Sequence, residues 1–151
     1  MTMTDVKLFN SPFEMELRIL LLLSENGGAS YSVDRIVALD FISCYASDFN
    51  LPFSNLHGHN NYKYGEISNR RMLVQEAVKS LVTKGLIEVE VNKGYLFSVT
   101  ENGKKYAHKM KSDYAKEYKA IAKASTKKYR KDSDEGILTE IQSYSIRSLK
   151  G

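Results

Sequence analysis

The segment Leu81–Lys104, LVTKGLIEVEVNKGYLFSVTENGK, carries the strongest indication of the fold. Gly85 follows a run of helix-forming residues, which is typical of a helix C-terminus. Residues 86–91 alternate apolar and acidic side chains, as a half-buried strand does. Residues 92–94, Asn-Lys-Gly, favour a hairpin turn. The segment therefore predicts a helix, a two-stranded hairpin and a further helix that Thr100 caps.

Three helices are predicted before this hairpin. Ser11 and Ser32 are N-cap signals, and apolar residues recur after each at helical spacing. The first helix has its apolar stripe at Phe13, Leu17, Leu20 and Leu21, and the second runs to about Ser47. A long loop, Asp48–Gly65, precedes a third helix that Ser68 caps. The residues predicted to be buried include Leu20, Val37, Phe41, Val78 and Leu81.

These elements together favour one fold class, which is mainly α with a small β-hairpin. Three short helices that bury their apolar stripes together, covered on one side by a hairpin, form a winged helix-turn-helix core. We predict an N-terminal arm at residues 1–10, the winged-helix core at 11–103 and a basic helical extension at 104–151 packed on that core. Within the extension, the pattern predicts a helix over Glu101–Met110, a lysine-rich helix to about Lys131 and a last short helix to about Leu149.

Positive charge is concentrated in the extension. Between Lys104 and Lys131 the chain has 11 basic residues against two acidic ones. Such a block favours an anionic partner, either nucleic acid or an acidic protein face, although a solvated helix face is the plainer alternative. Helical spacing puts Tyr114, Tyr118 and Ile121 on a docking stripe. The candidate binding residues are Lys109, Lys116, Lys119, Lys123, Lys127, Lys128, Arg130 and Lys131.

The third helix is where a winged helix contacts DNA. Arginine and glutamine suit base edges, and lysine suits phosphates. The candidates on this helix and on the hairpin are Asn69, Arg70, Arg71, Gln75, Lys79 and Lys93. A helix-turn-helix reader joins its second and third helices by about three or four residues. The long segment Asp48–Gly65 therefore argues against sequence-specific recognition by this helix.

Asp40 lies at the edge of the buried face of the second helix. A carboxylate there needs a partner. Arg18 on the first helix, or Arg70 and Arg71 on the third, can provide one. We predict a structural ion pair of Asp40 with Arg18 or Arg71, and a functional acid is the alternative.

The sequence gives no motif for catalysis, for a cofactor or for a metal. It has no P-loop, no GxSxG elbow and no HExxH. Its histidines, His57, His59 and His108, lack the spacing of a zinc site. Cys44 lies on an apolar helix face, where cysteine is usually an inert small hydrophobe. We therefore expect a protein that is not an enzyme and binds no cofactor.

The overall composition bounds the class of protein. One cysteine excludes an internal disulfide. The longest apolar run, Ile19–Leu23, is far shorter than a membrane span. The N-terminus also lacks the pattern of a signal peptide. The expected location is the cytoplasm.

Several short motifs resemble one family. They are NSPFE at residues 10–14 with Leu17-Arg18, DRIVALDF at 34–41, Gly65-Glu66, Arg70-Arg71 and LVTKGLI at 81–87. Together they are similar to the middle component of bacterial ABC three-component conflict systems, a group that includes the small subunit of Lamassu-type defence systems. The likeness covers about residues 10–130. The chain departs from the family pattern at Phe41, where tyrosine is common, and in its lysine-rich fifth helix.

The resemblance implies a winged-helix adaptor in an antiviral or antiplasmid complex. Such a subunit is expected to link an ABC or SMC-like ATPase to an effector such as a nuclease and to regulate that effector. DNA is then expected to bind through the assembled complex. A winged-helix DNA-binding transcriptional regulator is the alternative, because the same fold serves both roles.

Overall fold

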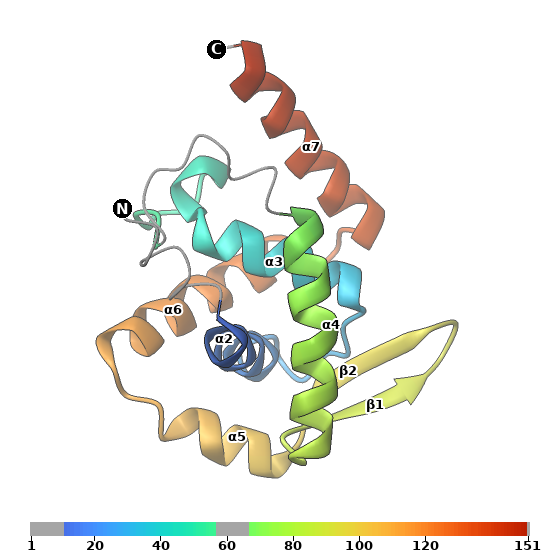
Figure 1. The fold of residues 1–151 in the computed structure, drawn as a ribbon. Helices are drawn as coiled ribbons and strands as arrows, with labels where there is room; N and C mark the ends of the chain where they lie inside the picture. The colour runs from blue at the N-terminus through green and yellow to red at the C-terminus, as the bar shows by residue number, and fades with distance from the viewer. Residues whose placement is uncertain (1–10, 57–66, 151) are drawn as a thin grey trace.

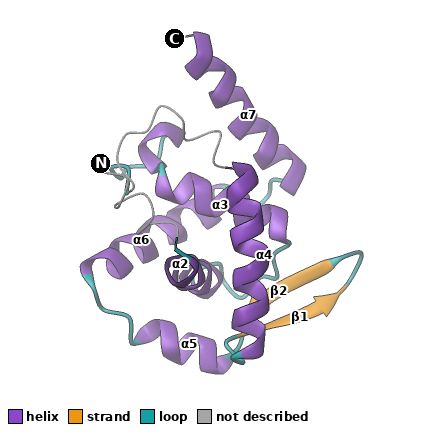
Figure 2. Ribbon diagram, in the orientation of Figure 1, coloured by secondary structure: helices purple, strands orange, loops and turns teal. Residues whose placement is uncertain are grey.

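The computed structural model describes residues 11–56 and 67–150. The predicted arm at residues 1–10, His57, His59 and part of the predicted loop lie outside the described residues. The helical elements are α2 (Pro12–Ser24), α3 (Val33–Cys44), the 3-10 helix η1 (Ala46–Phe49), α4 (Ile67–Thr83), α5 (Glu101–His108), α6 (Asp113–Lys128) and α7 (Asp134–Lys150). The strands are β1 (Ile87–Val91) and β2 (Tyr95–Val99). The described chain is mainly helical with a two-stranded hairpin (Figure 2), which confirms that part of the predicted fold class.

Helix α2 forms the centre of the molecule. Figure 1 shows it end-on, with α3, α4, α5 and α6 arranged around it, and α2 contacts each of these helices. Its seven buried residues therefore cover more of its circumference than the predicted single stripe. Phe13, which the sequence places on that stripe, lines an open groove together with Leu17 and Leu20, and it is 67% exposed. The predicted burial of Leu20, Val37, Phe41, Val78 and Leu81 is confirmed.

The hairpin begins two residues after Gly85, whose backbone φ of +73° suits a glycine at a helix C-terminus. The two strands are antiparallel, with Val89 opposite Phe97 and Val91 opposite Tyr95. On this face Phe97 is buried, but Val91 is 77% exposed because the tip extends away from the helices (Figure 1). The chain just before α3 also pairs with β2, since Tyr31 and Phe97 exchange two backbone hydrogen bonds of 2.8 Å.

Several predicted element boundaries were wrong. The second helix ends at Cys44 and is followed by η1, so that the start of the predicted loop is helical. Ser68 lies within the first turn of α4, which begins at Ile67, and does not cap it. A serine is tolerated there because the first backbone N–H groups of a helix have no partner within the helix. Ser112 separates α5 from α6 by capping α6. Helix α6 ends at Lys128, before the predicted end at about Lys131, and α7 begins at Asp134, where acidic residues suit a helix N-terminus.

The last helix is anchored to α3 through Arg35. The guanidinium group of Arg35 donates to a carboxylate oxygen of Asp134 at 3.0 Å and to the backbone carbonyls of Tyr129 and Asp132. Farther along α7, the ring of Tyr144 lies 4.8 Å from that of Phe49. These contacts hold the start and middle of α7 against α3 and η1, and Figure 1 shows its C-terminal end extending from the body. Within the described ranges, no helix has both the length and the apolar character needed to cross a membrane.

Gly103 provides a test of this packing. A Cβ atom added at Gly103 would lie far inside van der Waals contact with the backbone oxygen of Leu86 and 2.8 Å from Cγ2 of Val99. Because the neighbour is backbone, α5 would have to move, and we expect Gly103→Ala to lower the free energy of unfolding by about 1–3 kcal/mol. Urea denaturation measures this change. Gly136→Ala, at an exposed position in α7, is the control. A loss at Gly103 no larger than that at Gly136 would contradict the close approach.

Candidate functional site

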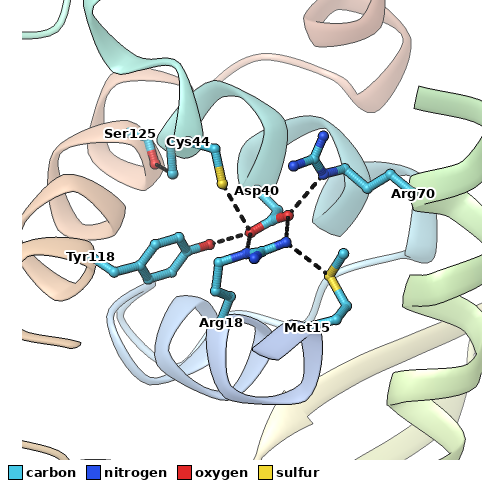
Figure 3. Close-up of polar contacts among 8 residues, drawn as sticks. Met15, Arg18, Asp40, Cys44, Arg70, Tyr118 and Ser125 are labelled. Carbon is cyan, nitrogen blue, oxygen red and sulfur yellow. Dashed lines mark hydrogen bonds and ion pairs between the residues drawn. The ribbon is translucent and has the colours of Figure 1, made fainter. Parts of the chain in front are cut away.

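The carboxylate of Asp40 is the centre of a buried polar cluster, shown in Figure 3. Its Oδ1 atom accepts hydrogen bonds from Nε of Arg18 at 2.9 Å and from the hydroxyl of Tyr118 at 2.7 Å. Its Oδ2 atom accepts from a terminal nitrogen of Arg18 at 3.2 Å and from Nε of Arg70 at 3.0 Å. All four side chains are buried. The cluster therefore joins α2, α3, α4 and α6 at one point.

Electrostatics keep this cluster charged. Burial alone would raise the pKa of Asp40, but the guanidinium groups of Arg18 and Arg70 outweigh it and hold that pKa well below its usual range. Burial and the charge of Asp40 raise the pKa of Tyr118, so that its hydroxyl stays a donor. The same two causes raise the pKa of the Cys44 thiol to about 12. The carboxylate is fully used in structural contacts, and Cys44 is a protonated, buried thiol.

The structure corrects the predicted partners of Asp40. Arg18 is one partner, as proposed, but Arg71 is not. Arg71 forms an ion pair with Asp34 on the surface, because it leaves α4 on the side of the first turn of α3. Arg70 is the second partner, and only 2% of its side chain is exposed. The prediction that Arg70 contacts DNA was wrong, because its side chain is buried and forms an ion pair with Asp40.

The other candidates on α4 and the hairpin lie on the surface. Asn69, Gln75 and Lys79 are exposed on α4, and Lys93 is exposed in the hairpin turn. Lys79 lies 4.0 Å from Glu76, so an acidic residue shares this face. The burial of Arg70 and the pairing of Arg71 leave α4 with little positive charge for DNA.

Helix α6 has a buried side and a basic side. Its stripe of Tyr118 and Ile121 packs against the chain's own core, and Tyr114 is half-buried beside it. On the opposite side, Lys116, Lys123 and Lys127 are exposed. They are separated by seven and four residues, so they form a straight line about 16 Å long on the helix surface. We call these three residues the lysine line.

The remaining basic candidates differ in the exposure and in the hydrogen bonds of their side chains. Lys109, Arg130 and Lys131 are exposed just outside α6. Lys119, predicted as exposed, is half-buried, and its ammonium group donates to the backbone carbonyl of Met110 at 2.9 Å. Lys128 donates to the backbone carbonyl of Phe49 at 2.6 Å. These last two lysines tie segments of the chain together, because their long side chains reach carbonyls that lack a helical partner.

An apolar groove was not foreseen from the sequence. It lies between α2, α5 and the end of α4, and its volume is about 330 Å³. Phe13 and Tyr106, which line it, are 67% and 50% exposed. The full lining is Phe13, Glu16, Leu17, Leu20, Leu81, Lys84, Leu86, Tyr106 and Met110. The spacing of Tyr106 and Met110 by four residues was the available signal, but only the fold brings them beside Phe13.

Within the described ranges, no group of three or more His, Cys, Asp or Glu residues is placed to hold a metal ion. His108, at the end of α5, is exposed.

Comparison with known proteins gives one match. A family model described as "ABC-three component (ABC-3C) system Middle Component 2" matches residues 8–151. Neither the curated proteins nor the solved structures gave a match. The family match spans almost the whole chain, including the Asp40 cluster, the groove and the lysine line. The chain therefore belongs to the family of middle component 2 of ABC-three component systems.

Proposed function

We propose that the chain is a non-enzymatic adaptor that links the ABC-type ATPase of its system to an effector and regulates that effector. Family membership implies partner components in a complex. The observation that carries the adaptor role is the presence of two surfaces of different chemistry on different elements. The lysine line lies on α6, whereas the apolar groove lies between α2, α4 and α5. A subunit that bridges two partners needs two such surfaces.

The environments of the two candidate reactive groups, Asp40 and Cys44, support a role without catalysis. Asp40 is locked between two arginines, and the pKa of Cys44 is raised to about 12 by burial. A nucleophilic cysteine needs the opposite environment, with a lowered pKa and access to solvent. The ATP hydrolysis and the effector chemistry would then belong to the partners.

A winged-helix arrangement of the core is part of this proposal. The element order of three helices followed by a hairpin supports it. The pairing of Tyr31 with Phe97 supports it further, because the segment between the first two helices adds to the hairpin as a short third strand would. The hairpin would then be the wing.

The lysine line would face the anionic partner of the assembled complex, which we propose to be DNA. Three lysines spaced along about 16 Å can contact successive phosphates but provide no base-specific contacts. The helix offers no exposed aromatic platform beside them, so binding by this subunit alone would be weak. A Lamassu-type system with an SMC-like ATPase and a nuclease effector, acting against phage or plasmids, is the specific assignment that we favour.

The alternative, a DNA-binding transcriptional regulator, has less support. It would use α4 and the hairpin to contact bases. Arg70 is buried, and the exposed strand β1 has Glu88 and Glu90, which would repel phosphates. In favour of this alternative, α4 exposes Asn69, Gln75 and Lys79.

Co-purification tests the proposed function. The full chain with an affinity tag is co-expressed with the proteins encoded beside it, and the purified material is analysed by native mass spectrometry. We expect a stoichiometric complex that contains an ABC-type ATPase, and we expect no ATP turnover by the chain alone. Purification of the chain without any of its neighbours, combined with sequence-specific binding to DNA near its own gene, would favour the regulator instead.

A further inference from the structure

The apolar groove between α2, α4 and α5 has the features of a docking site. Its walls come from leucine and methionine side chains, and Phe13 and Tyr106 expose large parts of their rings at its edge. Its volume of about 330 Å³ has room for on the order of ten water molecules at ~30 Å³ each. Water against apolar walls is released favourably when apolar side chains replace it. The groove is therefore better suited to an apolar partner than to solvent.

The charge around the groove defines its partner more closely. Glu16, the acidic residue in the lining, accepts hydrogen bonds from Lys84 at 2.8 Å and Ser80 at 2.7 Å, so it is already neutralised. Lys105 and Lys109, which lie outside the groove lining, are exposed on α5 and just after it, four residues apart. Lys109 is three residues from Tyr106, which places it next to that side chain on the helix surface. Exposed positive charge thus lies within one helical turn of Tyr106, on the α5 side of an apolar groove.

We propose that this groove binds an amphipathic helix of a partner component, with an apolar face and acidic residues along its flank. A helix places apolar side chains at i, i+3, i+4 and i+7, which matches a trough between helices. Its acidic flank would face Lys105 and Lys109. This inference rests on the proposed function, because it assumes partner components, but it adds which surface one of them uses.

Site-specific photo-crosslinking tests the proposal in the complete complex. The photoreactive amino acid p-benzoyl-phenylalanine replaces Tyr106 in one variant and Phe13 in another, both at exposed aromatic positions. Met72, which is also 67% exposed but lies on α4 away from the groove lining, is the matched control position. Each variant is co-expressed with the neighbouring components, irradiated, and analysed by peptide mass spectrometry. We expect both groove positions to crosslink to one predicted helix with acidic residues, and Met72 not to reach it.

A synthetic peptide of the crosslinked segment then measures the contact with the full chain. We expect Tyr106→Asp and Phe13→Asp each to weaken peptide binding at least tenfold, and Met72→Asp to leave it unchanged. The double variant Lys105→Glu, Lys109→Glu is expected to weaken binding and to reduce its dependence on salt. Circular dichroism confirms that each variant is folded. The second groove variant keeps the test valid if the first one fails to fold.

Three results would overturn the proposal. They are a crosslink to a second copy of this chain, a crosslink to a segment without acidic residues, and an intact complex in which neither groove position crosslinks. The proposed function would survive all three, because each can occur in a complex that still forms. If the unmodified chain forms no complex at all, the proposed function itself fails.

Discussion

Replacing Asp40 with asparagine is expected to lower the free energy of unfolding by about 3–5 kcal/mol, because it leaves two buried guanidinium groups without their counter-charge. The substitution keeps the size of the side chain, so the loss reports charge and not volume. Nε of Arg18 and Nε of Arg70 lie 2.9 and 3.0 Å from the carboxylate, and both side chains are buried. Urea denaturation followed by circular dichroism measures the change.

Asp34→Asn is the matched control. Asp34 is on the same helix and also pairs with an arginine, Arg71, but both side chains are 40–45% exposed. Exposed ion pairs contribute about 0–1 kcal/mol, so the control is expected to stay in that range. Similar losses at Asp40 and Asp34 would contradict the assignment of the cluster as the buried connection among four helices.

The same cluster predicts how stability depends on pH. The pKa of Asp40 is lowered in the folded state, so the unfolded state binds the proton more readily. The contribution of Asp40 is therefore present above its unfolded pKa of about 3.9 and is lost as the pH falls below that value. Urea denaturation of the wild type and Asp40→Asn between pH 7 and pH 3 is expected to show that the difference between them shrinks with acidity. A difference that stays constant would contradict a charged Asp40.

Reversing the charge of the lysine line is expected to have the second large effect, which is on DNA binding. We expect the triple variant Lys116→Glu, Lys123→Glu, Lys127→Glu to fold normally, since all three side chains are exposed, and to weaken DNA binding by the assembled complex on the order of 100-fold at low salt. Each lost phosphate contact also lowers the salt slope by about 0.9, so the slope is expected to fall by about 3. Fluorescence anisotropy with labelled duplex DNA at several salt concentrations measures both quantities.

The outcomes of this experiment separate the candidate partners. Loss of DNA affinity with an intact complex supports DNA as the partner of the lysine line, whereas loss of the complex without DNA points to an acidic protein face. The control pair Lys79→Glu, Lys93→Glu changes α4 and the hairpin instead. A larger loss in the control pair would favour the transcriptional regulator. If neither variant changes DNA affinity or the integrity of the complex, the lysine line is a solvated helix face.

The local signals in the sequence were enough to place the hairpin and the helices beside it. Gly85, the alternating strand at 86–91 and Thr100 depend on backbone conformation and capping, which act within a few residues. The pairing of Asp40 was only half predictable. Arg70 and Arg71 are adjacent in sequence, and which of them faces the core is decided by how α4 lies on α3.

The surfaces were the least predictable part. Phe13 has the spacing of an apolar-stripe residue, but it lines an open groove between α2, α5 and the end of α4, and a helical pattern in α2 alone cannot show that. Lys119 and Lys128 have the spacing of surface lysines, but their ammonium groups donate to backbone carbonyls outside their own helix, those of Met110 and Phe49. These features arise from contacts between different elements of the fold.

The central claim is that this chain connects two other components of its system, and a bridging assay tests it most directly. The proposed ATPase and effector partners are purified separately and mixed with and without the chain, and size-exclusion chromatography with light scattering gives the mass of the complex. We predict that the ATPase and the effector co-elute only when the chain is present. Co-elution of the two without the chain, or failure of the chain to bind either, would contradict the claim.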